Sequence, residues 1–164
     1  MLKGVSWKLV LTTLLLFVLT NAFAVKNSAV GYWLTWNHQT KQPSSVIKIW
    51  GDKGLYFGKV YKIVADKKAN IISRCSKCEG KQYNKPILGL TIIRDMRLDD
   101  GVYRDGFILD PLEGKEYHAK MEVTDDNKFL RLRGYVGIPL FGRTETWSRA
   151  SLAQVRRLKS AKLS

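Results

Sequence analysis

The pair of cysteines in the segment Arg74-Cys75-Ser76-Lys77-Cys78 is the part of the sequence most able to do chemistry. Cysteines at this spacing form a local disulfide, act as a redox dithiol or supply two ligands to a metal ion. The cations of the segment would favour the reactive thiolate, but redox pairs usually sit where a helix follows a strand, and the sequence indicates no such unit. In an oxidising compartment we expect first a disulfide between Cys75 and Cys78. It would pin the long loop between Val64 and Pro86.

The two histidines, His38 and His118, are the remaining candidates for metal or acid–base chemistry. A structural zinc site needs four ligands, and His118 lies on the polar face of its predicted strand. Neither histidine has a recognisable nucleophile beside it, as a Ser-His-acid triad would need. Asp110 precedes Pro111 in a turn, where an aspartate usually accepts hydrogen bonds from its own backbone. We therefore expect no catalytic residue, no metal site and no cofactor.

A glycine and a tryptophan near one end of the predicted domain match an arginine near the other end. Gly31 and Trp33 lie on the first predicted strand, and Arg149 ends the last one. A guanidinium stacked on an indole contributes about 0.5–2 kcal/mol and keeps its planar donors for nearby carbonyl groups. The first and last strands are neighbours when a sheet closes on itself. We predict that these three residues together close one end of a barrel.

Eight segments of the sequence have the composition or the periodicity of β-strands. They are residues 31–36, 46–50, 55–64, 86–94, 102–109, 117–124, 130–136 and 142–150. The alternation is cleanest in the last three segments. Residues Tyr117, Ala119, Met121 and Val123 share one face, as do Leu130, Leu132, Gly134 and Val136. A period of two predicts a sheet with one buried and one wet face.

Short strands joined by tight turns, without long helices, leave a β-sandwich or a closed barrel as the architecture. Closure removes the edge strands through which proteins aggregate. We predict an all-β fold, a small antiparallel up-and-down barrel of about eight strands, as one domain over residues 25–150. Residues 151–164 form a basic tail with Leu152, Val155 and Leu158 at helical spacing. This tail is frayed, forms a short helix that caps the barrel, or lies on a membrane surface.

The first 24 residues have the three parts of a secretory signal peptide. Lys3 and Lys8 provide a positive start, an apolar stretch begins at Leu9, and Ala22-Phe23-Ala24 is a cleavage motif of the A-x-A type. The apolar stretch is too short for an ordinary membrane span. Cleavage following Ala24 would leave 140 of the 164 residues, and we expect a periplasmic or secreted protein.

A strong positive charge is the main feature of the composition. Loss of two lysines with the signal peptide lowers the formal net charge from +14 to +12. This charge favours acidic partners such as an anionic membrane surface, a glycan or a nucleic acid. Export makes nucleic acid an unexpected partner. A chain of this length supports one modest core, and we expect a monomer.

A series of motifs resembles the bacterial exported family known as domain of unknown function 2147. They lie in order over about residues 30–150: Gly31-x-Trp33, Leu55-Tyr56-Phe57-Gly58-Lys59-Val60, Pro86-Ile87-Leu88-Gly89-Leu90, Asp110-Pro111-x-x-Gly114-Lys115-x-Tyr117, Leu132-Arg133-Gly134-Tyr135 and Gly142-Arg143-Thr144-x-Thr146-Trp147-x-Arg149. The Gly-x-Trp motif with a distant arginine is also similar to lipocalins and other calycins, in which that arginine packs on the tryptophan. The resemblance implies an exported small β-barrel with no established catalytic residue.

A small barrel either fills with side chains or leaves room for one ligand. Our first hypothesis is a binding module of the cell envelope for a small apolar or amphiphilic molecule. Candidate lining residues are Trp36, Tyr56, Phe107 and Tyr117. Glu145, on the same strand face as Trp147, is either a polar plug in a barrel end or an anchor for the ligand. The alternatives are a structural or interaction protein with a filled barrel and a basic surface, and, third, an enzyme.

Overall fold

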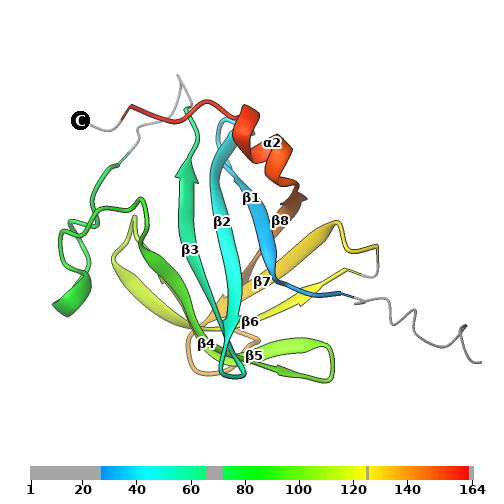
Figure 1. Cartoon of the computed structure of the whole chain (residues 1–164). Helices are drawn as coiled ribbons and strands as arrows, with labels where there is room; N and C mark the ends of the chain where they lie inside the picture. Colours follow the sequence, from blue (N-terminus) through cyan, green and yellow to red (C-terminus); the bar gives the residue numbers. More distant parts are fainter. Residues whose placement is uncertain (1–26, 66–71, 125, 163–164) are drawn as a thin grey trace, which may run out of the picture.

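The fold is an antiparallel barrel that closes on itself, as predicted (Figure 1). A computed structural model describes residues 27–65, 72–124 and 126–162, so the proposed signal peptide lies outside the described residues. Within these ranges, eight strands are neighbours in chain order. They are β1 Gly31–Trp36, β2 Pro43–Asp52, β3 Leu55–Ile63, β4 Thr91–Asp99, β5 Val102–Asp110, β6 Lys115–Val123, β7 Phe129–Tyr135 and β8 Gly142–Ala150. The remaining elements are the 3-10 helix η1 Gly80–Gln82 and the helix α2 Leu152–Arg157.

Two tight hairpins show how the sequence sets the order of the strands. The β2–β3 turn passes through Lys53 and Gly54, with φ of 48° and 80°. The β4–β5 turn passes through Asp100 and Gly101, with φ of 45° and 77°. Two successive residues with positive φ match the right-handed twist of the flanking strands, and glycine and aspartate accept that conformation readily. Pairing of β1 with β8, through Tyr32↔Ala150 and Trp33↔Arg149, then closes the barrel.

The fourth strand begins at Thr91, whereas the sequence predicts a strand over 86–94. The apolar residues before Thr91 form a turn in the β3–β4 connection, in which Gly89 has a φ of 86°. Ile87 and Leu90 are buried there, and the Leu90 amide donates to the Ile87 carbonyl at 3.0 Å. The apolar character of 86–90 therefore reflects packing of this connection onto the core and not a strand.

Matching irregularities in β4 and β5 change which side chains face inward. Asp95 and Asp105 both have a φ of 59°, and the β5–β6 register shifts between Tyr103 and Gly106. A Cβ at Gly106 would come within 2.6 Å of the Arg94 carbonyl oxygen, so only glycine fits there. Such bulges reverse the inward and outward alternation along a strand.

Inward-facing side chains from all parts of the sheet fill the core. The largest fully buried ones are Trp33, Tyr103, Ile47, Ile49, Ile93, Met96, Met121 and Leu130. Burial of each such apolar side chain contributes about 1.5–3 kcal/mol. Val136, predicted as the last inward residue of its strand, lies beyond β7 and is 67% exposed.

The C-terminal tail packs on the outer wall of the barrel (α2, red in Figure 1). Val155 of α2 is buried with Val46, Val64 and Ala150. Ser151 and Gln154 form a capping box that begins the helix. Of the three forms considered for the tail, the structure therefore has a short helix against the barrel. Over the part of the chain that is described, no helix is long and apolar enough to cross a membrane.

Candidate functional site

The two ends of the barrel are built differently. The β2–β3, β4–β5 and β6–β7 turns lie around one end, with the start of β1; we call this the closed end. The β1–β2, β3–β4, β5–β6 and β7–β8 connections lie around the other end, which we call the mouth. A ligand site at the mouth would need a sealed closed end beneath it.

At the closed end, Arg149 covers the buried ring of Trp33. The Arg149 Cζ atom lies 4.1 Å from the ring centroid, and the indole Nε1 donates to the Ala29 carbonyl at 2.7 Å. Gly31 has a φ of 134°, and a Cβ there would approach Arg149 Nη1 to 3.2 Å. The structure thus brings together Gly31, Trp33 and Arg149 at this end.

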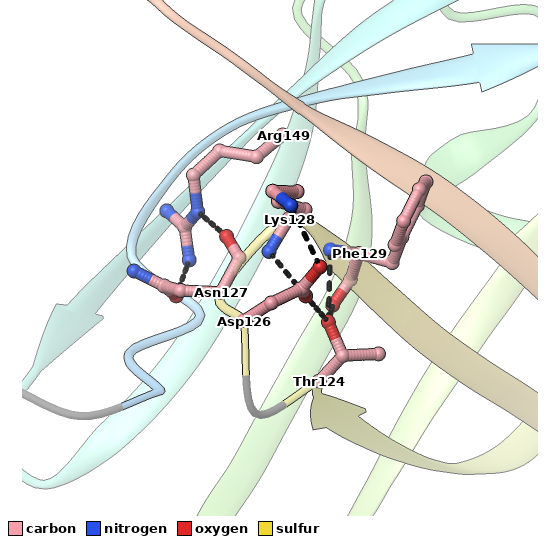
Figure 2. A network of polar contacts seen from close by, with 6 residues as sticks. All are labelled: Thr124, Asp126, Asn127, Lys128, Phe129 and Arg149. Carbon is pink, nitrogen blue, oxygen red and sulfur yellow. Dashed lines mark hydrogen bonds and ion pairs between the residues drawn. The ribbon is translucent and has the colours of Figure 1, made fainter.

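The Arg149 guanidinium also joins two chain segments that are distant in sequence (Figure 2). Its Nε donates to the Asn127 carbonyl at 2.7 Å and its Nη2 to Asn127 Oδ1 at 2.6 Å. On the other side, Nη2 donates to the Ser28 carbonyl at 2.5 Å and Nη1 to the Val30 carbonyl at 3.2 Å. Burial lowers the pKa of Arg149, but a guanidinium stays charged at neutral pH. Arg149 therefore fastens the β6–β7 turn to the segment before β1.

The β6–β7 turn that carries Asn127 has a polar network of its own (Figure 2). The Thr124 hydroxyl donates to Asp126 Oδ1 at 2.6 Å, and the Lys128 amide donates to the same oxygen at 3.1 Å. These bonds, the Thr124 bond above all, lower the pKa of Asp126. Asn127 takes a φ of 58°, and both its carbonyl group and its side chain accept from Arg149.

Residues 27–30, just before β1, cover the barrel interior at the closed end. Ala29 is fully buried, and its amide donates to the Tyr103 hydroxyl at 2.9 Å. The Tyr103 ring in turn meets Tyr56 edge-on, with centroids 4.7 Å apart. Tyr56, a candidate lining residue, thus belongs to the core of the closed half and not to the mouth.

Some inward-facing side chains at the mouth, namely those of Ile63, Ile108 and Tyr117, are only partly buried. Ile93, which pairs with Ile108, and Leu132, which pairs with Glu145, are 0% and 3% exposed. Gly134 lets Ile108 and Tyr117 pack close to the β7 backbone, because a Cβ there would lie 3.2 Å from Ile108 Cγ2 and 3.6 Å from Tyr117 Cβ. The Tyr117 hydroxyl donates to Glu113 at 3.0 Å, which raises the pKa of Tyr117.

Polar side chains form a rim above this apolar floor. His38 Nε2 lies 2.9 Å from Glu145 Oε1, and Arg143 Nε lies 3.6 Å from the same oxygen. The hydroxyls of Thr35 and Ser45 are 2.8 Å apart. Glu145 thus lies at the mouth, whereas Arg149 of the same strand lies at the closed end.

Two of the candidate lining residues lie outside the barrel interior. Trp36 is 41% exposed, and its Nε1 donates to the Ser148 hydroxyl at 3.2 Å. Phe107 lies on the outer surface between Arg94 and His118, at 4.0 and 4.9 Å. Of the four candidates, only Tyr117 faces the mouth.

The cysteines form a disulfide, and the segment that contains it packs against the β5–β6 turn. Cys75 and Cys78 are 0% and 2% exposed, so the bridge is shielded from thiol exchange. Cys75 Sγ lies 3.3 Å from the Pro111 carbonyl oxygen, and a Cβ at Gly114 would overlap the Lys77 carbonyl group. Among the described side chains, no three metal-ligating groups come together.

Asp110 stabilises the same β5–β6 turn. Its Oδ1 accepts hydrogen bonds from the amides of Leu112 at 2.9 Å and Glu113 at 3.3 Å. This is the turn role expected from the sequence. A shallow hollow of about 290 Å³ lies in the β3–β4 connection and at the start of β4, and it is lined by Gln82, Lys85, Pro86, Leu88, Gly89, Leu90 and Thr91.

Barrel topology and construction of the closed end define the class of the protein as a small lipocalin-like barrel. A solved structure with this fold is HP1028 of the human pathogen Helicobacter pylori, described as belonging to the lipocalin family. The two chains are 17% identical, the match covers 84% of this chain and 92% of that one, and the TM-score is 0.66. At this identity the likeness shows the fold alone.

The chain belongs to the family described as "Uncharacterized protein conserved in bacteria (DUF2147)", whose model matches residues 31–149. The matched range begins at the glycine and ends at the arginine of the closed end. No curated protein sequence matches the chain.

Proposed function

We propose that the protein is exported and binds one small apolar or amphiphilic molecule at the mouth of its barrel. The observation that carries the proposal is the partly buried apolar surface at the mouth, next to a closed half that is filled. Trp33, Ile49 and Met96 of the closed half are 0% exposed, so side chains of the protein itself fill that half. Ile63 and Ile108 face inward at the mouth yet are only partly buried. An apolar molecule placed there would remove this exposed surface from water.

The arrangement of polar groups favours a molecule with a polar head. An apolar chain would lie on Ile63, Ile108 and Tyr117, and its head would reach the charged rim of His38, Arg143 and Glu145. Deeper on the inner face of β8, the buried Nε1 of Trp147 has no acceptor among the described residues. A buried donor without a partner is costly, and a bound water would satisfy it.

Export is supported by the signal-like first 24 residues and by the disulfide, since disulfides persist in oxidising compartments. The lipocalin family of HP1028 supports ligand binding only through the shared fold. The alternative, an interaction protein with a filled barrel, rests on the dense packing of the closed half.

A fluorescence titration tests the proposed site directly. The probe is 11-(dansylamino)undecanoic acid, which has an apolar chain and a carboxylate. We expect saturable binding, and Ile108→Trp should weaken it at least about tenfold by filling the mouth, a loss of about 1.4 kcal/mol. Leu98→Trp is the matched control, because Leu98 is 48% exposed at the far end of β4. Equal affinity of the two folded variants would overturn the proposed site.

A further inference from the structure

The β7–β8 connection presents an unusual concentration of exposed apolar side chains. We call residues 136–141, Val136-Gly137-Ile138-Pro139-Leu140-Phe141, the apolar loop. Its four large side chains are 67%, 55%, 75% and 71% exposed, in the order Val136, Ile138, Leu140 and Phe141. Contiguous apolar groups left in water commonly mark an interaction site.

The backbone of the apolar loop is held in place by Arg133 of β7. Its Nε donates to the Pro139 carbonyl at 2.6 Å and its Nη2 to the Leu140 carbonyl at 3.0 Å. Within the loop, the Phe141 amide donates to the Ile138 carbonyl at 3.1 Å. Backbone groups that are already bonded in this way lose less free energy on leaving water.

Cations surround the base of the apolar loop. Residues 133–144 include Arg133 and Arg143 and no aspartate or glutamate. Arg133 donates to two carbonyl groups and to the Thr144 hydroxyl, none of which neutralises its charge. Lys120 lies opposite Arg133 in the β6–β7 ladder and is exposed. The side chain of Arg143, just after the loop, is 70% exposed and lies 3.6 Å from Glu145 Oε1.

We infer that the apolar loop inserts into the surface of an anionic lipid bilayer. Its apolar side chains would enter the headgroup–acyl boundary, with Arg133, Arg143 and Lys120 at the level of the anionic headgroups. The exposed apolar side chains beside cations favour an anionic lipid surface over a protein partner. Because the loop borders the mouth, insertion would bring the mouth to the membrane surface. The inference does not depend on whether the mouth holds a ligand.

Vesicle co-sedimentation of the mature chain tests this inference. Vesicles of phosphatidylethanolamine and phosphatidylglycerol should carry the wild-type protein down, whereas pure phosphatidylcholine should not. The double variant Leu140→Ser/Phe141→Ser should bind at least about tenfold more weakly, because two inserting side chains are lost. The matched control is Leu98→Ser/Leu112→Ser, which removes two apolar side chains that are 48% and 60% exposed elsewhere. It should bind like the wild type.

Three results would overturn the inference. They are no binding of the wild-type protein to the anionic vesicles, unchanged binding of the loop variant, and a lipid-free wild-type dimer that the loop variant dissociates. The last would make the loop an interface between copies of this chain. Ile108→Trp, which fills the mouth, should still sediment with the vesicles. Membrane docking and ligand binding can therefore fail separately.

Discussion

Arg149 is the residue on which the closed end depends most. It stacks on Trp33 and donates hydrogen bonds to Ser28, Val30 and Asn127. The stacking pair could be predicted from residue types, because an arginine on the last strand and a tryptophan on the first become neighbours in a closed sheet. The hydrogen-bond partners could not, since they depend on the left-handed conformation of Asn127 and on the path of the chain before β1.

Substitutions of the Trp33–Arg149 pair should be strongly non-additive. Trp33→Ala should cost about 3–5 kcal/mol of unfolding free energy through the cavity it leaves. Arg149→Lys should cost on the order of 1 kcal/mol or more, because an ammonium group cannot reproduce the planar stack and its fork of donors. The double variant should lose less than the sum. Urea unfolding monitored by circular dichroism measures all three, and strict additivity would show that the two side chains act independently.

Asp126 should carry an acid-dependent part of the stability. Its pKa in the folded protein is lowered, chiefly by the Thr124 hydroxyl. A lowered folded-state pKa stabilises the protein above the unfolded-state value, and this contribution is lost as the pH falls through the folded-state pKa. Thr124→Val should therefore raise the pKa of Asp126, whereas Thr124→Ser should leave it low. Carboxyl NMR titration reads this value, and an unchanged pKa in the valine variant would exclude the assigned cause.

At the scale of elements, the alternation of apolar and polar residues predicts the buried face correctly where a strand is regular. β6 buries Ala119, Met121 and Val123 on one face, as its sequence predicts. Alternation counted from Tyr103 would place Phe107 inside, but the bulge at Asp105 turns Phe107 outward and Ile108 inward. The candidate lining of the mouth could not be chosen correctly from the sequence, because a bulge leaves little trace in residue types.

The contact between the disulfide segment and the β5–β6 turn should make Gly114 unusually sensitive. Gly114 has a φ of 72°, and a Cβ there would overlap the Lys77 carbonyl group. Gly101 has a φ of 77°, and a Cβ added to it would meet no atom within 4 Å, so it isolates the backbone effect. Gly101→Ala should cost about 1–2 kcal/mol, and Gly114→Ala clearly more. Equal shifts in the urea midpoint would mean that the two segments separate without cost.

At the scale of the whole molecule, export stays a prediction, because residues 1–24 lie outside the described residues. The charged start, apolar centre and Ala22-Phe23-Ala24 ending favour cleavage after Ala24. N-terminal sequencing of protein expressed in a bacterial host should begin at Val25. Full-length chain retained in the membrane fraction would instead indicate an uncleaved anchor.

The barrel as a whole combines a sealed end with a mouth that has an apolar floor and a charged rim. The sealed end follows from residues that could be recognised in the sequence. The mouth depends on Ile63, Ile108 and Gly134, whose common position arises only from the register of strands far apart in the chain. Binding at the mouth is therefore the central claim that we add to the fold.

Native mass spectrometry of the mature protein, purified from the envelope of its own cells without detergent exchange, tests that claim most directly. We expect a population heavier than the mature chain by the mass of one small amphiphile, which denaturation releases. The Ile108→Trp variant should lack this adduct, and Leu98→Trp should retain it. A wild-type protein that carries no adduct, and acquires none when incubated with extracted envelope lipids, would contradict the account.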